Sequence, residues 1–209
     1  MRGLDDQARV YRQRIYRQVA ALHAANINQG FLATLGEPFL ALMYRAIDEA
    51  PDSILIVEER DERVIGFVSG GVGMGGIYRK MFQRPVGLAV ALLPSLLRPA
   101  RVWRILEILR YVKQRGPHGP EACPVELPSA ELLSIAVAAE ARGSGVSERL
   151  YRQLEARFRE AAVGAFKITV GDALAPAHRF YRKMGARPVG RIEVHRGEGS
   201  VVYVQGLKE

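Results

Sequence analysis

A strand, a glycine-containing turn and a helix follow one another in the second half of this sequence. Residues 131–137 are mostly apolar and predict a strand, and a helix with one apolar face runs to about Ala162. Gly143 and Gly145 lie in the turn between them. The first N–H groups of a helix lack partners inside the helix, and the helix dipole makes that end positive. Because glycine lets the backbone approach an anion closely, the turn is expected to hold a phosphate or diphosphate.

Length and composition indicate a single folded domain over residues 1–209. The chain is 48% hydrophobic and 25% charged, which is ordinary for a globular protein. Its one cysteine, Cys123, excludes an internal disulfide and argues against a cysteine-based zinc site, so no metal is expected. The first residues are charged and no apolar signal segment follows them. We therefore expect a reducing, cytoplasmic location.

The net charge of +8 is concentrated in one segment. Residues 75–118 contain a single acidic residue, Glu107, beside these basic residues: Arg79, Lys80, Arg84, Arg98, Arg101, Arg104, Arg110, Lys113 and Arg115. Apolar residues within 102–112 follow a helical spacing, so we expect a basic helical insertion over 75–118. It could bind an anionic substrate, an acidic carrier protein or an anionic membrane, or it could be a solvated face. No nucleic-acid-binding motif accompanies the charge, and no nucleic-acid partner is expected.

The remaining elements are predicted from hydrophobic periodicity and turn residues. We expect a strand near Arg9–Ile15 and a short helix over Val19–Ala24. Residues 70–76 include five glycines and are expected to be irregular or mobile. The other expected elements are a helix over 37–50, a hairpin of strands 53–58 and 63–69, strands at 166–170, 187–195 and 200–206, and a helix that starts near Pro176 and ends at Gly185.

Two short motifs carry a family resemblance. Residues 142–147 read Arg-Gly-Ser-Gly-Val-Ser, and residues 177–186 read Ala-His-Arg-Phe-Tyr-Arg-Lys-Met-Gly-Ala. The first resembles the pyrophosphate loop of the GCN5-related N-acetyltransferase (GNAT) superfamily, with Ser147 in place of the last Gly or Ala. The second is similar to the helix motif Ala-x-x-Phe-Tyr-x-Lys-x-Gly-Phe, with Ala186 in place of the final aromatic residue. A glycine loop alone is weak evidence, but two motifs in the expected order are specific.

The resemblance implies a mixed α/β fold with a mostly antiparallel central sheet flanked by helices, and with the helical insertion outside the common core. It also implies acetyl-CoA, or another acyl-CoA, as the cofactor. In the family the turn binds the diphosphate through its backbone, and the end of the central strand pairs with the pantetheine arm. On this sequence the implied cofactor-binding residues are Ile135, Ala136, Val137, Arg142, Gly143, Ser144, Gly145, Val146, Ser147, Ala177 and Phe180.

The same resemblance implies two catalytic residues. Tyr181 stands where the family places a general acid, which would protonate the CoA thiolate; the alternative is a ring that only packs beneath the cofactor. Glu131 opens the central strand, where some members place a base that takes the amine proton; the alternative is a solvated glutamate at the strand entry. By strand alternation, one face is expected to carry Glu131, Leu133, Ile135 and Val137.

The function that the resemblance implies is transfer of an acetyl group to a primary amine of a small molecule, with an amino sugar or sugar nucleotide as a candidate. Cys123 has no neighbouring histidine in the sequence to activate it, so direct transfer is expected rather than an acyl-enzyme path. Two alternatives are acetylation of a protein or peptide amine, and a non-catalytic acyl-CoA-binding module with a regulatory role. The sequence leaves the oligomeric state open.

Overall fold

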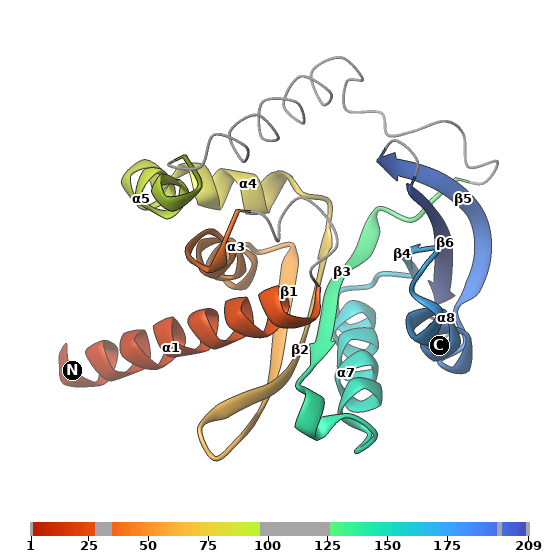
Figure 1. Ribbon diagram of the computed structural model, residues 1–209, viewed down its shortest axis with the longest axis horizontal. Coiled ribbons are helices and arrows are strands. Elements are labelled where there is room, and N and C mark those ends of the chain that lie inside the picture. The colour runs from red at the N-terminus through yellow and green to blue at the C-terminus, as the bar shows by residue number, and fades with distance from the viewer. Residues whose placement is uncertain (1, 28–34, 97–125, 196–197, 208–209) are drawn as a thin grey trace.

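A six-stranded sheet with helices on both faces forms the core of the computed structural model, which describes residues 2–27, 35–96, 126–195 and 198–207 (Figure 1). The strand order is β1-β2-β3-β4-β6-β5. The strands are β1 (Ser53–Arg60), β2 (Arg63–Val72), β3 (Ala130–Val137), β4 (Ala165–Gly171), β5 (Arg187–His195) and β6 (Glu198–Gly206). Among these strands β3 and β4 run parallel, and all other neighbours run antiparallel. The predicted mixed, mostly antiparallel fold is confirmed.

The helices divide between the two faces of the sheet. One face packs against α1 (Arg2–Asn26) and α3 (Glu37–Glu49), and the other against α7 (Val146–Glu160) and α8 (Ala175–Lys183). A short 3-10 helix, Ala139–Ala141, precedes α7. Each face buries its own apolar cluster, so the sheet is covered on both sides over β2 and β3. This layering is visible in Figure 1, where α1 and α3 lie opposite α7.

The predicted strand at Arg9–Ile15 is wrong, because these residues belong to α1. The buried residues of that helix are Ile15, Tyr16, Val19, Ala20 and His23. Their spacing of three and four residues places them on one helical face against α3 and the sheet. The sequence pattern of residues 9–15 is ambiguous because the burial that defines the helical face begins only at Ile15.

The glycine-rich segment 70–76 is also more regular than expected. Strand β2 continues through Gly70 to Val72, and helix α4 (Gly75–Phe82) starts three residues later. A Cβ at Gly70 would lie 2.8 Å from Cζ of Phe158 in α7. Glycine at this position therefore allows α7 to pack closely on the strand.

Helices α4 and α5 (Pro85–Leu96) are the described part of the predicted insertion, and both pack against α3. The helix expected within 100–115 lies outside the described residues.

The predicted hairpin is confirmed, and its two turn residues, Asp61 and Glu62, both have positive φ. Such angles suit the tight turn that joins two twisted antiparallel strands. The single domain over 1–209 stays a prediction.

A bulge interrupts β3 at Leu133. Ser69 of β2 pairs with Ser134, but the adjacent Gly70 pairs with Leu132, so Leu133 is an extra residue in the strand. A bulge of this kind shifts the alternation of side chains between the two faces by one position.

The bulge overturns the expectation that four residues of β3 share one face. Leu133 packs in the cluster with α1 and α3, whereas Ile135 and Val137 pack in the cluster with α7 and α8. Glu131 lies between Ala130 and Leu132, both buried on the α7 side, so its own side chain points toward the opposite face. Glu131 and Ile135 therefore lie on different faces of the sheet.

Candidate functional site

The parallel strands β3 and β4 separate soon after they meet. They pair over only three positions, from Ala130 with Phe166 to Leu132 with Ile168. Beyond this point β3 continues to Val137 and, within the described sheet, pairs with β2 alone. The backbone groups of Ile135–Val137 that point toward β4 are therefore open to a ligand. An extended chain could pair with them as an added strand would.

The turn that follows β3 forms an anion-binding cradle. Gly143 and Gly145 have φ of 74° and 79°, in the left-handed region. The Ser144 hydroxyl donates to the Ala141 carbonyl over 2.7 Å, which closes the turn. Left-handed residues that alternate with right-handed ones turn successive N–H groups toward one concave surface. A Cβ at Gly143 would meet no protein atom within 4 Å, so within the protein itself the glycine is required only for its backbone angle.

Helix α7 starts from this cradle with its first N–H groups free. Gly145 is the N-cap residue, and no side chain caps the helix. The N–H groups of Val146 and Ser147, in the first turn, consequently have no partner within the helix. Together with the helix dipole they favour a diphosphate at this end. The residues present thus fit the nucleotide end of an acyl-CoA.

The cradle is braced by hydrogen bonds to two residues outside the sequence motifs, Asn26 and Glu58. Arg142 donates a hydrogen bond to the side chain of Asn26, at the end of α1. Arg149 donates to the Ser144 carbonyl over 3.1 Å and to the carboxylate of Glu58 in β1. Asn26 and Glu58 are distant in sequence from the loop, and no local signal marks them. Only the folded chain brings them to it.

Tyr181 lies in an aromatic cluster on the α7 side of the sheet. Its ring contacts those of Tyr151, Phe180 and Tyr203, and its side chain is buried. Burial raises its pKa above the usual value, so the phenol stays protonated at neutral pH. Among the described residues its hydroxyl makes no hydrogen bond. A protonated phenol without a competing partner can donate to a group that enters the site.

Most of the predicted cofactor-binding residues with apolar side chains gather in this same cluster. Ile135, Val137, Val146, Ala177 and Phe180 all belong to it. Ala136 lies in the cluster on the opposite face. The predicted role of Ala136 is backbone pairing with the pantetheine arm, and its backbone lies in the part of β3 that does not pair with β4.

Glu131 sits in the second of the three rungs that join β3 to β4, on the face opposite Tyr181. Its Oε2 atom lies 3.7 Å from Nζ of Lys167, and Thr169 hydrogen-bonds the same carboxylate. Burial raises the pKa of this carboxyl above its usual value, and Lys167 and Thr169 only partly offset that effect. The carboxylate is partly buried and paired, unlike a freely solvated strand-entry residue.

A buried hydrogen-bond chain lies beside the open part of β3, and no sequence motif marks its residues. The Tyr44 hydroxyl lies 2.6 Å from Nδ1 of His23, and the Ser134 side chain hydrogen-bonds the same hydroxyl. Ser134 immediately precedes Ile135–Val137. Helices α1 and α3 are thus tied to the bulged strand by polar contacts as well as by apolar packing.

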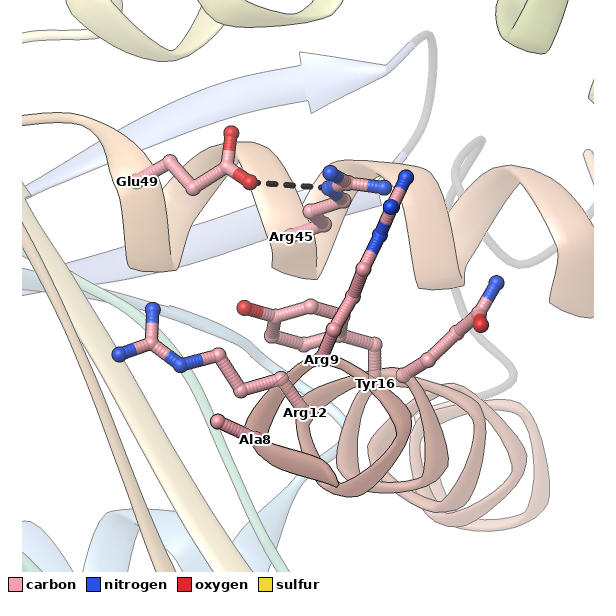
Figure 2. Close-up of a pocket in the computed structure, with 7 residues that line it drawn as sticks. Ala8, Arg9, Arg12, Tyr16, Arg45 and Glu49 are labelled. Atoms are coloured by element: carbon pink, nitrogen blue, oxygen red, sulfur yellow. Dashed lines mark hydrogen bonds and ion pairs between the residues drawn. The ribbon is translucent and has the colours of Figure 1, made fainter. Parts of the chain in front are cut away.

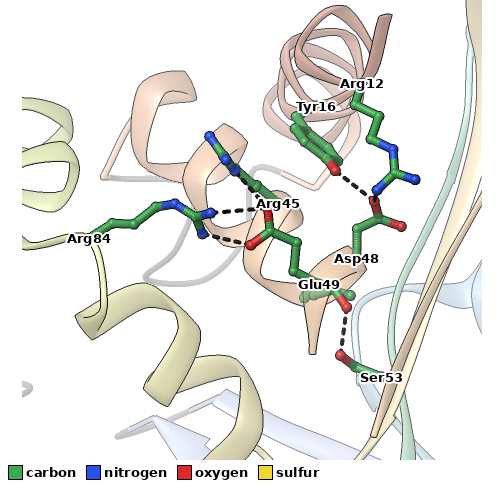
Figure 3. A network of polar contacts seen from close by, with 8 residues as sticks. Arg12, Tyr16, Arg45, Asp48, Glu49, Ser53 and Arg84 are labelled. Carbon is green, nitrogen blue, oxygen red and sulfur yellow. Dashed lines mark hydrogen bonds and ion pairs between the residues drawn. The ribbon is translucent and has the colours of Figure 1, made fainter. Parts of the chain in front are cut away.

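A groove of about 540 Å³ lies elsewhere, between α1 and α3 (Figure 2). It is lined by Ala8, Arg9, Arg12, Gln13, Tyr16, Arg45 and Glu49. None of the predicted site residues lines it. The groove is flanked by a polar network in which Tyr16 donates to Asp48 over 2.6 Å and Arg84 donates to Glu49 over 2.7 Å (Figure 3). These contacts hold α1, α3 and the start of α5 together.

The described residues contain no group of three or more His, Cys, Asp or Glu side chains that could hold a metal ion. Cys123 lies outside the described residues.

Comparison with known proteins supplies the family. The model of the acetyltransferase (GNAT) family matches residues 24–186. The chain belongs to the GNAT family. As a GNAT acetyltransferase it is an acyltransferase that uses an acyl-CoA, which confirms the predicted enzyme class and cofactor. A comparison with curated proteins gives no match.

Solved structures share the GNAT fold at low sequence identity. A crystal structure of an acetyltransferase is 17% identical with a TM-score of 0.58, covering 94% of this chain and 96% of the other. An aminoglycoside 6'-N-acetyltransferase complexed with coenzyme A is 12% identical with a TM-score of 0.57, covering 93% and 91%. A protein from Desulfovibrio desulfuricans assigned to the GNAT family is 15% identical with a TM-score of 0.54, covering 90% and 92%. At these identities the likeness concerns the fold alone.

Proposed function

We propose that this GNAT protein transfers the acetyl group of acetyl-CoA directly to a primary amine of a small molecule. The observation that carries the proposal is the opening between β3 and β4 beside the uncapped start of α7. The start of α7, at one end of this opening, suits the diphosphate of acetyl-CoA. The exposed backbone of Ile135–Val137, along its side, suits the extended pantetheine arm. Tyr181 supplies a protonated group from the α8 side.

Binding divides between the turn and the strand. The N–H groups from Gly143 to Ser147 would hold the diphosphate, since the Arg142 N–H already donates to the Ala139 carbonyl. The open backbone of Ile135–Val137 would pair with the pantetheine arm. Ala177 and Phe180 line the α8 side of the same cluster. When bound, acetyl-CoA supplies a thioester whose acyl carbon can be attacked by an amine.

The two titratable residues have complementary roles on opposite faces of the sheet. Direct transfer forms a C–N bond, breaks the C–S bond, and moves one proton from the amine and one to the sulfur. Glu131 takes the amine proton, either itself or through a water molecule, because a protonated amine cannot attack. Tyr181 gives its phenolic proton at the sulfur atom. A base and an acid on opposite faces of the sheet do not compete for the same proton.

An amino sugar is the first class of acceptor to test. The aminoglycoside 6'-N-acetyltransferase that shares the fold suggests this class, although the likeness itself concerns only the fold. A paired Glu131 next to Lys167 would also suit an acceptor that carries both an amine and an anionic group, such as an amino sugar nucleotide.

The proposal is tested by two measurements on the full chain. Isothermal titration should detect one acetyl-CoA site per chain, and thiol release should depend on an added amine. Amino sugars, sugar nucleotides and peptides with free amino groups form the acceptor panel. Turnover only with peptides would replace the small-molecule acceptor, and tight binding without turnover on any amine would favour a regulatory module. No heat with acetyl-CoA would refute the site itself.

A further inference from the structure

Helices α4 and α5 expose apolar side chains on their outer surface. Among the described residues, eight large apolar side chains are exposed, and four of them are Tyr78, Phe82, Val86 and Val90. We call these four the outer residues. Phe82 and Val86 are 68% and 75% exposed. Clustering of this kind within 13 positions of one chain is unusual for a surface that faces only water.

The outer residues are distinct from those that anchor the two helices to the fold. Ile77 and Met81 of α4, and Ala91 of α5, are buried in the cluster with α1 and α3. Each outer pair has a spacing of four, so Tyr78 with Phe82 and Val86 with Val90 each share a helical face. Both helices are thus apolar on an inner face, which is packed, and on an outer face, which is not.

An ion pair attaches the junction of α4 and α5 to α3. Arg84, between α4 and α5, donates to Glu49 of α3 over 2.7 and 3.2 Å, one hydrogen bond to each carboxylate oxygen (Figure 3). Burial alone would raise the pKa of Glu49, but hydrogen bonds from Arg84 and Arg45 lower it, so the pair stays ionised at neutral pH. A two-point contact of this kind restrains the junction of α4 and α5.

The charged residues within the segment that forms α4 and α5 all have one sign. No Asp or Glu occurs between residues 75 and 106, whereas Arg79 and Lys80 lie beside the outer residues on α4. A soluble anion would match the charge but leave the apolar side chains uncovered. A bilayer with anionic headgroups matches both, because its boundary region accepts apolar side chains and its surface attracts cations.

We propose that the outer face of α4 and α5 binds the surface of an anionic membrane. In the part of the chain that the structure describes, no helix has the length and apolar character needed to cross a bilayer. The binding proposed is therefore interfacial, with Phe82 and Val86 inserted at the headgroup boundary and Arg79 and Lys80 among the phosphates. It is independent of the acceptor proposed above and of acetyl-CoA binding.

Vesicle flotation with the full chain tests this inference. Vesicles of equal parts phosphatidylglycerol and phosphatidylcholine should carry the protein upward at low salt, and vesicles of phosphatidylcholine alone should not. The double variant Phe82→Glu/Val86→Glu should lower the partition coefficient by about tenfold or more. The matched control is Val10→Glu, because Val10 is equally exposed at 68% but lies on α1.

A second pair of variants separates charge from apolar contact. Arg79→Ser should weaken binding about fivefold, whereas Arg159→Ser, which removes the same charge from α7, should change it little. Circular dichroism and acetyl-CoA affinity verify that every variant is folded. Wild-type protein that does not float, or controls that lose as much binding as the tested variants, would overturn the inference. So would binding to an acidic acyl carrier protein in the absence of flotation, which would assign the surface to a protein partner.

Discussion

The Tyr44 hydroxyl hydrogen-bonds Nδ1 of His23 over 2.6 Å in the core between α1, α3 and the sheet. Ser134 also hydrogen-bonds this hydroxyl. Burial raises the Tyr44 pKa, whereas the hydrogen bond with Ser134 lowers it by a smaller amount. A lowering is expected when Ser134 is the donor and the Tyr44 oxygen accepts. The Tyr44 O–H is then free to donate to Nδ1, which puts the proton of neutral His23 on Nε2. The chain of donors runs from the bulged strand to α1.

Removal of this hydroxyl should destabilise the protein. Tyr44→Phe leaves the buried Nδ1 of His23 without a partner, which costs about 1–3 kcal/mol in the free energy of unfolding. Urea denaturation measures the loss. The double variant Tyr44→Phe/His23→Phe removes both polar partners and should be less destabilised than the sum of the two single variants. Strict additivity would mean that the two side chains do not interact.

Protonation of His23 should contribute to acid denaturation. Burial lowers the pKa of His23 from 6.5 to about 4. Between these values the unfolded state binds more protons than the folded state, so stability rises with pH through this window and is lost as pH falls toward 4. The loss near pH 4 is about 3 kcal/mol at most. His23→Phe should flatten the pH dependence of the unfolding midpoint between pH 4 and 6.5, and an unchanged slope would contradict the assignment.

Tyr181→Phe should reduce turnover without loss of acetyl-CoA affinity. The ring remains and keeps its aromatic contacts, but the proton donor is gone, so kcat should fall about a hundredfold or more. Steady-state kinetics and calorimetry measure the two quantities on the same preparation. Tyr151→Phe is the matched control, because Tyr151 is fully buried in the same cluster and donates to Gln205. Wild-type turnover in Tyr181→Phe would remove the residue from the chemistry.

Glu131→Gln should lower kcat/KM for the amine and remove an acidic limb from its pH profile. The base is active only when ionised, and the raised pKa of Glu131 moves this limb to higher pH than for an ordinary glutamate. The raised pKa of Glu131 also makes stability depend on pH, in the opposite direction from the effect of His23. The folded state binds the proton more tightly, so stability falls as pH rises through the window between the unfolded and folded pKa. A wild-type pH–rate profile in the variant would favour a purely structural glutamate.

Gly143→Ala should weaken acetyl-CoA binding through backbone strain. No atom lies within 4 Å of the added Cβ, but a φ of 74° costs an alanine about 1–2 kcal/mol and disfavours the cradle. The dissociation constant should rise about tenfold. Gly164→Ala is the control, since Gly164 is equally open and has no positive φ. Equal effects of both substitutions on affinity would show that the left-handed angle is not what the ligand needs.

Much of the fold could be predicted because its signals are local. The left-handed glycines of the cradle, the helix that begins at its end, and the hairpin at residues 53–69 each depend on neighbours within a few positions. The family motifs extend over ten residues or fewer, and they placed Tyr181 and the cradle on the right elements. The helical nature of residues 9–15 was missed because residues 9–13 are exposed and show no apolar periodicity, and the buried face of α1 begins only at Ile15.

Long-range contacts decided the rest. The bulge at Leu133 exists only in the register between β2 and β3, and it alone separates the face of Glu131 from that of Ile135. The bond from Arg142 to Asn26 joins residues 116 positions apart. Linear order carries no information on which distant partners will meet, because strand register and helix docking are set by packing of the whole core. The motifs therefore indicated that the protein binds an acyl-CoA. The tertiary structure determined that β3 separates from β4, which distant residues contact the cradle, and on which face of the sheet each side chain of β3 lies.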